Sequence, residues 1–162
     1  MAPYAGRLED SIRSLRPIVE DVAKLHKDGC VHRDIKPENI LMSEAGSPLV
    51  SDFGLARQVT TESRITSTGV VIGTPAYMSP EQVLGEDDQL GPASDVFSLG
   101  VVAYELLAGK HPFIGKTVTE TMISIVQRDP PDLRQANSRV SLDLETIVMK
   151  CLSKSLADRY PD

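Results

Sequence analysis

The sequence has little cysteine, an excess of negative over positive charge, and no long hydrophobic run. Its two cysteines, Cys30 and Cys151, lie far apart and form neither a CxxC motif nor a zinc-ligand pattern, so we expect reduced thiols in a cytoplasmic protein. The formal net charge of -6 argues against a nucleic-acid binder, which needs a basic face. Because no stretch of about 18 apolar residues is present, the sequence predicts no membrane span and no membrane contact from this segment.

The remaining composition is that of an ordinary globular domain. Hydrophobic residues make up 41% and charged residues 25% of the 162 positions, close to the averages for such domains. A chain of this length can bury roughly 68–70% of its unfolded surface. We therefore expect one domain with a core of its own.

The spacing of apolar residues predicts several helices. Between residues 12 and 25 they recur at steps of three and four, which places them on one face of a helix that Gly29 would end. The face consists of Ile12, Leu15, Ile18, Val19, Val22 and Leu25. Residues 94–109 are apolar nearly all round, which indicates a central buried helix. Further helices are expected at about 118–127 and 142–152.

Two short apolar runs, 39–42 and 49–51, predict a small antiparallel hairpin because residues 43–48 between them are rich in turn formers. Residues 52–81 show no clear period and contain many Ser, Thr and Gly residues; a loop of this length in a compact domain is usually functional. A polar loop is expected at 85–92. The predicted fold class is mainly α, or α+β, with the hairpin at the edge of the functional site.

Two motifs flank this hairpin in the sequence. They are His32-Arg33-Asp34-Ile35-Lys36-Pro37-Glu38-Asn39 and Asp52-Phe53-Gly54. Their order and separation match the catalytic loop and the metal-binding motif of protein kinases. An isolated Asp near a Lys is usually a solvated surface pair, but the joint occurrence of both motifs by chance is very improbable.

These residue types suit phosphoryl transfer, which needs a positioned hydroxyl and neutralisation of charge on phosphate oxygens. Asp34 is the candidate base that orients the attacking hydroxyl. Lys36 could lie alongside it and donate to the transferring phosphate. The amide oxygen of Asn39 and the carboxylate of Asp52 are oxygen ligands of the kind that Mg²⁺ prefers.

Further segments extend this likeness over nearly the whole chain. Residues 73–81 resemble the end of a kinase activation segment, with Ser79 in place of the common Ala. Residues 95–100 resemble the start of the buried F helix, with Phe97 where Trp or Tyr is more usual, and residues 158–160 resemble the segment before the last helix. The chain thus resembles the C-terminal lobe of a eukaryotic-type (Hanks-type) serine/threonine protein kinase, of a bacterial kind.

The resemblance implies specific roles at the site. Asp34 and Lys36 would be catalytic, Asn39 and Asp52 would be metal ligands, and Lys36, Asn39 and Asp52 together would bind the cofactors. These would be ATP and Mg²⁺, with Mn²⁺ as an alternative, and the substrate would be a protein Ser or Thr. Lys36 indicates Ser/Thr rather than Tyr specificity, and Thr74 would lie near Asp34 and Lys36.

The resemblance also implies a structural frame for these residues. Asp95 would hold the backbone of the turn at residues 32–33 through hydrogen bonds. Glu81 and Arg159 would form a buried ion pair. We expect His26 to be a packing residue and His32 to be a structural turn residue.

Arg33, beside the proposed catalytic aspartate, suggests control by phosphorylation of the activation segment, because its guanidinium would favour a phosphate there. Thr66, Ser67 and Thr68 are the candidate sites, the alternative being that they are ordinary polar loop residues. The hypothesis is that phosphorylation orders the loop. Full activity after all three are changed to Ala would contradict it.

Nothing before His32 matches the Gly-rich loop, strand lysine or helix glutamate that kinases use to hold ATP, and Gly6 has no further glycines at the needed spacing. We expect residues 1–162 to be a partial kinase domain, the C-terminal lobe from about the E helix to just before the last helix, with the N-lobe absent. The surface facing that lobe would be apolar, so we expect marginal stability and self-association.

Two functions remain open from the sequence. The first is a serine/threonine kinase, although the isolated chain would turn over poorly. The alternative is a noncatalytic, kinase-like module that docks partners or regulates a complete kinase. Intact Asp34, Lys36, Asn39 and Asp52 argue for the first. The sequence leaves the protein substrate and the oligomeric state undetermined.

Overall fold

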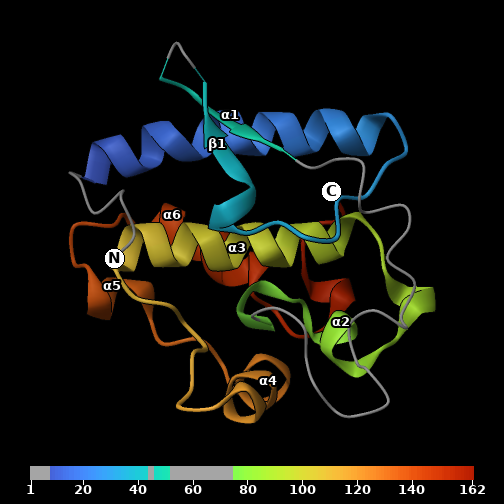
Figure 1. The fold of residues 1–162 in the computed structure, drawn as a ribbon. Helices are drawn as coiled ribbons and strands as arrows, with labels where there is room; N and C mark the ends of the chain where they lie inside the picture. Colours follow the sequence, from blue (N-terminus) through green and yellow to red (C-terminus); the bar gives the residue numbers. More distant parts are fainter. Residues whose placement is uncertain (1–7, 44–45, 52–74) are drawn as a thin grey trace.

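A central helix, α3 (Pro92–Ala108), is packed on several sides by other helices of the domain (Figure 1). The computed structural model describes residues 8–43, 46–51 and 75–162. Helix α1 (Leu8–Lys27) lies alongside α3 and runs in the opposite direction, and α6 (Leu142–Cys151) packs against another side of α3. This arrangement encloses α3 and confirms the prediction of a central buried helix.

Helix α1 uses its apolar stripe to cover α3 and the hairpin. Its buried side chains follow steps of three and four, at Ser11, Leu15, Ile18 and Val22. The exposed fractions of Ile12 and Val19 are 43% and 49%, so these two residues of the expected face lie at the margin of the stripe. The chain turns away after Lys27, where Gly29 has a φ of 72° that a glycine adopts readily.

Close packing between α3 and α6 depends on Gly100. A Cβ at this position would lie 2.7 Å from the Cβ of Cys151 and 3.1 Å from a methyl carbon of Leu152. A Cβ essentially never comes as close to another atom as the first of these distances, and the second is tighter than most Cβ contacts. The absence of a side chain therefore allows α6 to lie directly on α3.

The predicted hairpin is present as β1 (Ile40–Met42) and β2 (Pro48–Val50), which pair antiparallel with Ile40 opposite Val50. Val50 is buried against α1, whereas Leu41 and Leu49 face away and are about half exposed. This alternation is expected when only one face of a two-stranded sheet is covered.

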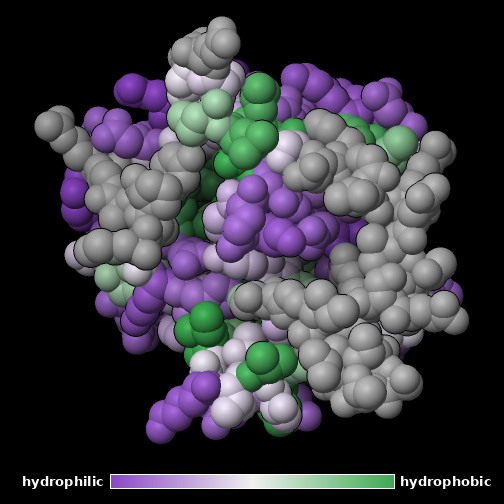
Figure 2. Space-filling view, in the orientation of Figure 1, coloured by the Kyte–Doolittle hydropathy of each residue, from purple (hydrophilic) through white to green (hydrophobic). Residues whose placement is uncertain are grey.

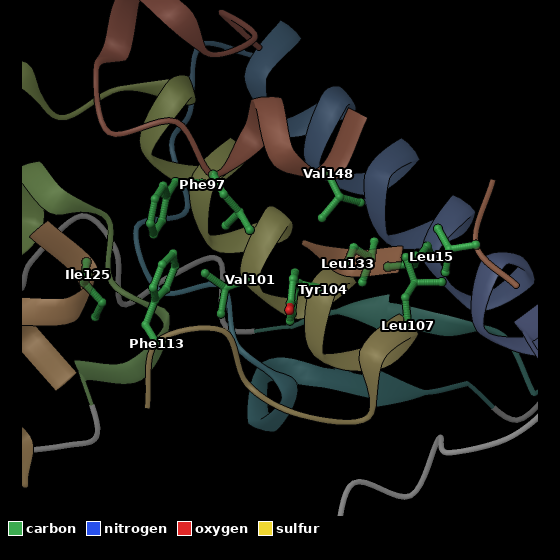
Figure 3. Close-up of a cluster of buried hydrophobic side chains, with 11 residues drawn as sticks. Leu15, Phe97, Val101, Tyr104, Leu107, Phe113, Ile125, Leu133 and Val148 are labelled. Atoms are coloured by element: carbon green, nitrogen blue, oxygen red, sulfur yellow. The ribbon is translucent and has the colours of Figure 1, made fainter. Parts of the chain in front are cut away.

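The hydrophobic core consists of two clusters of buried side chains. The larger one surrounds α3 (Figure 3) and comprises Leu15, Phe97, Val101, Tyr104, Leu107, Phe113, Ile125, Leu133, Val140, Val148 and Leu152. Within it the rings of Phe97 and Phe113 stack with centroids 5.8 Å apart. The smaller cluster lies between α1, β2 and α3 and comprises Ile18, Val22, Ile35, Val50 and Val102. Ile35 belongs to the catalytic-loop motif, so this motif is anchored in the core.

Shorter elements complete the domain. They are η1 (Pro37–Asn39), η3 (Pro75–Tyr77), α2 (Pro80–Leu84), η4 (Asp87–Gln89), α4 (Val118–Gln127), α5 (Leu133–Ala136) and η5 (Leu156–Asp158). Helices α4 and α6 lie where the sequence predicts them, whereas α2 and α5 are additional. The mainly helical fold class with a small antiparallel hairpin is confirmed. In the described ranges, no helix combines the length and apolar character that crossing a bilayer requires.

Candidate active site

The turn at His32 and Arg33 is held by one buried carboxylate. Asp95, in the first turn of α3, accepts hydrogen bonds from the backbone N–H groups of His32 and Arg33, each at 2.7 Å. Arg33 has a φ of 65°, in the left-handed region that non-glycine residues seldom occupy. Such a conformation persists when its surroundings fix it, and the Asp95 carboxylate supplies that constraint. The role expected for Asp95 is confirmed.

His26 is a further part of this arrangement, although the sequence predicted only a packing role for it. Its Nε2 lies 2.9 Å from Oδ2 of Asp95, and its side chain is 4% exposed. The residue is distant in sequence from Asp95, so no local motif links the two. A fully buried acid needs polar partners. For Asp95, this requirement was the one feature from which a role for His26, in the last turn of α1, could have been inferred.

His32 connects the turn to the end of β2. Its Nε2 lies 2.9 Å from the carbonyl oxygen of Ser51, and its Nδ1 accepts the backbone N–H of Asp34 at 3.3 Å. Both contacts are satisfied by the tautomer that carries its proton on Nε2. His32 is therefore a structural residue of the turn, as expected, and it anchors the backbone directly before Asp52.

Three residues of the predicted site meet at the carboxylate of Asp34. Its Oδ2 accepts from Nζ of Lys36 at 2.8 Å and from Nδ2 of Asn39 at 3.0 Å. Within the part of the chain that the structure describes, no hydrogen bond reaches Oδ1. Because the side chain of Asp34 is 47% exposed, an incoming group can approach it from solvent.

Asn39 is fixed so that its amide nitrogen faces Asp34. Nδ2 also donates to the backbone oxygen of Asp34 at 2.7 Å. The backbone oxygen of Asn39 accepts from the N–H and the hydroxyl of Ser51, at 2.8 and 3.1 Å. This orientation leaves the amide Oδ1 of Asn39 as the oxygen that could bind a hard cation. The second predicted ligand, Asp52, lies outside the described residues, as do Thr66, Ser67, Thr68 and Thr74.

The expected ion pair between Glu81 and Arg159 is present and buried. The guanidinium donates to both carboxylate oxygens, at 2.8 and 2.9 Å, and its remaining N–H groups reach backbone carbonyls of Ala93, Ser153 and Lys154. Burial has the largest single effect and would raise the pKa of Glu81. The hydrogen bonds from Arg159, Ser94 and the backbone, together with the charge of Arg159, outweigh burial and leave the pKa below its usual value. The pair fixes α2 to the C-terminal part of the chain.

The segment before α2 is anchored to α3 by Tyr77. Its hydroxyl donates to Glu105 at 2.5 Å, and its carbonyl accepts the hydroxyl of Ser98 at 2.7 Å. Burial, followed by the interaction with Glu105, raises the pKa of Tyr77 well above its usual value, so the phenol remains a donor. The ring of His111 contacts the ring of Tyr77 edge-on, with the two ring centroids 5.2 Å apart. Segment η3 is thus held in place beside α2.

In a comparison with known protein families, residues 8–161 match the family model described as "Protein kinase domain". The chain belongs to the protein kinase family. Its resemblance to bacterial serine/threonine kinases is also confirmed by relatives. The kinase chain is 44% identical to the serine/threonine-protein kinase PknL of Mycobacterium tuberculosis over 148 residues. These residues cover 91% of this chain and 36% of PknL.

A second relative is the serine/threonine-protein kinase PknB of Mycobacterium leprae. It is 42% identical over 135 residues, which cover 83% of this chain and 21% of PknB. The kinase chain therefore corresponds to about a third of the length of PknL and about a fifth of PknB.

Proposed function

We propose that this kinase domain transfers the γ-phosphoryl group of ATP to serine or threonine hydroxyls of protein substrates. The observation that carries the proposal is the carboxylate of Asp34, which is exposed, contacts Lys36 and Asn39, and stands on a turn fixed by Asp95. Use of ATP and a divalent metal is general in the family. The assignment of individual residues to these groups is our inference.

In the proposed mechanism, Asp34 orients the substrate hydroxyl and accepts its proton through Oδ1. Lys36 and Asn39 occupy Oδ2, so they fix the orientation of the carboxylate while Oδ1 remains available. Geometry of this kind, with the base held before the substrate arrives, is the main requirement for proton transfer from a hydroxyl. The ammonium of Lys36 is also placed to stabilise negative charge on the transferring phosphate.

The divalent metal would be held by Oδ1 of Asn39 together with the carboxylate of Asp52. We propose Mg²⁺, with Mn²⁺ as an alternative, because both ligands are oxygen atoms suited to hard cations. When bound, the metal neutralises charge on the phosphates of ATP. The amide orientation of Asn39 fits this role, since its nitrogen is already committed to Asp34.

A protein Ser or Thr as the acceptor is supported by Lys36 and by the similarity to PknL and PknB, both of which are named serine/threonine-protein kinases. The same arrangement of Asp34, Lys36 and Asn39 argues against the alternative of a noncatalytic regulatory module. We also propose that residues 1–162 form the C-terminal lobe of the kinase domain, from the E helix to just before the last helix. A cytoplasmic location remains a prediction.

The test is phosphotransfer from labelled ATP to a generic basic protein, with the full-length natural protein that contains this chain and with Mg²⁺ or Mn²⁺. We expect Asp34→Asn to lower kcat by about 10²–10⁴-fold, the usual contribution of a general base. Asp28→Asn, the same chemical change at an exposed position nearby, is the matched control and should retain activity. Undiminished transfer by Asp34→Asn would contradict the proposal, as would no transfer by the unmodified protein with either metal.

A further inference from the structure

Gln82 of α2 contacts the backbone of the catalytic turn. Its Nε2 donates a hydrogen bond of 2.7 Å to the carbonyl oxygen of Arg33. The two residues are far apart in the chain, and Gln82 belongs to no motif that the sequence analysis singled out. Because the carbonyl of Arg33 and the N–H of Asp34 form one rigid peptide group, this contact acts on the peptide that leads into Asp34.

The orientation of the Gln82 amide follows from its other contacts. Its Oε1 accepts the backbone N–H of Ser79 at 3.0 Å and lies 3.3 Å from the hydroxyl of Ser79. A flipped amide would place two donors together at Ser79 and two acceptors together at Arg33. One amide therefore caps the start of α2 with its oxygen and holds the catalytic turn with its nitrogen.

The backbone on the two sides of Arg33 is held by three described residues. Asp95 of α3 binds the N–H of Arg33, Gln82 of α2 binds its carbonyl, and His32 receives the N–H of Asp34 at the longer distance of 3.3 Å. Arg33 also holds a left-handed backbone conformation. The contacts of Gln82 and His32 both act on the peptide between Arg33 and Asp34, and the one from Gln82 is the shorter of the two.

We propose that Gln82 is a positioning residue for Asp34, which it orients through the carbonyl of Arg33. The preceding residue, Glu81, binds Arg159, so α2 connects the buried ion pair to the catalytic turn. The location of α2 thereby determines the direction in which the Asp34 carboxylate is presented. This inference rests on the proposed function, because it concerns the placement of the proposed catalytic group.

Gln82→Glu separates the positioning role from the capping role. A Glu is favoured at this capping position and can still accept from Ser79, but it replaces the donor that faces Arg33 with an acceptor oxygen. Gln82→Met has a similar length and removes both contacts. Gln89→Glu introduces the same charge at an exposed glutamine and is the matched control.

In the full-length protein, we expect Gln82→Glu to lower kcat by about tenfold or more, because small displacements of a catalytic group have large effects on rate. The KM for ATP and the melting temperature should stay close to those of the unmodified protein and of Gln89→Glu. Unchanged kcat in Gln82→Glu would overturn the proposal. The proposal would also be overturned if only Gln82→Met lowered kcat and the same variant had a lower melting temperature. That result would show that Gln82 acts only by capping α2.

A second readout does not depend on activity. Amide hydrogen exchange measured by NMR should be faster at Asp34 in Gln82→Glu, whereas His32 and Arg33, which Asp95 holds, should change little. Unaltered exchange at Asp34 would overturn the positioning role even if the protein proved inactive. If the unmodified protein transfers no phosphate but exchange at Asp34 increases, the proposed function fails and the structural inference stands.

Discussion

Glu81 and Arg159 are almost completely enclosed, with side chains 3% and 0% exposed. Removal of one partner would leave an uncompensated charge in the interior, which is strongly unfavourable. We expect Arg159→Met to lower the free energy of unfolding by about 3–5 kcal/mol, measured by chemical denaturation.

The double variant Glu81→Gln with Arg159→Met should be less destabilised than Arg159→Met, because it leaves no buried charge. Arg16→Met, which removes an exposed ion pair on α1, serves as the control and should leave stability unchanged. Equal effects of the buried and the exposed substitution would contradict the expectation.

His111 should make stability depend on pH. Burial lowers the pKa of His111 below its usual value of 6.5, and the charge of Glu105 opposes this only in part. The folded state therefore takes up the proton at lower pH than the unfolded chain, and stability is lost as the pH falls below about 6.5. Nδ1 already accepts the N–H of Phe113 at 3.0 Å, so a proton at that atom would also break a hydrogen bond.

The comparison variant is His111→Asn, whose amide oxygen can accept from Phe113 but does not titrate. Between pH 7 and pH 5, we expect the free energy of unfolding to fall more steeply in the unmodified protein than in this variant. Parallel curves from urea denaturation would show that His111 does not contribute.

At the level of residues, the sequence was sufficient for the parts of the site that belong to a recognisable motif. It was not sufficient for contacts between segments that are distant in the chain. Asp95, Glu81 and Arg159 make the contacts that the resemblance implied. His26 and Gln82 were not recognised, because a lone histidine on a helix and a glutamine after a short turn have no distinctive pattern. Their roles depend on which backbone and side-chain atoms the fold brings next to them.

At the level of elements, the packing of α3 on α6 depends on Gly100. Alanine has the higher helix propensity by about 1 kcal/mol, but its Cβ would overlap Cys151 and Leu152. Overpacking of this kind typically costs about 1–3 kcal/mol. We therefore expect Gly100→Ala to lower the midpoint of chemical denaturation.

A double-mutant cycle tests the cause of that loss. Cys151→Gly removes the atom nearest to the added methyl group, so the combined variant should be more stable than the sum of the single effects predicts. Additive effects would show that the two helices do not interfere at this point.

The pattern of apolar residues predicted α1, α3, α4, α6 and the hairpin. Helix α1 has one apolar face, α3 is apolar nearly all round, and the hairpin consists of two short apolar runs separated by turn-forming residues. Helices α2 and α5 have five and four residues, too few for a periodic pattern to be seen. Their positions depend on tertiary contacts, such as the ion pair of Glu81 with Arg159. The exposure of Ile12 and Val19 was likewise not predictable, because the width of the covered stripe depends on the neighbouring elements.

At the level of the whole molecule, apolar side chains are exposed on the hairpin (Figure 2). Leu41, Met42 and Leu49 are 55%, 49% and 46% exposed. Leu41 and Leu49 are cross-strand partners and form a contiguous apolar surface, which favours association. We therefore expect residues 1–162 to self-associate as concentration increases, as the sequence also suggested. Sedimentation velocity over a range of concentrations measures this.

The variant Leu41→Ser with Leu49→Ser should reduce association, while Leu142→Ser, which changes an exposed leucine on α6, should not. A clean monomer of the unmodified chain at high concentration would contradict the expectation.

The shared carboxylate of Asp95 has a consequence for the order in which the domain opens. It joins α1 through His26, the catalytic turn through His32 and Arg33, and α3 through its own backbone. These three segments should therefore behave as one cooperative unfolding unit, and the amide protons of His32 and Arg33 should exchange only when this unit opens. The backbone beneath the proposed catalytic group then shares the lifetime of the core, although the carboxylate of Asp34 faces solvent.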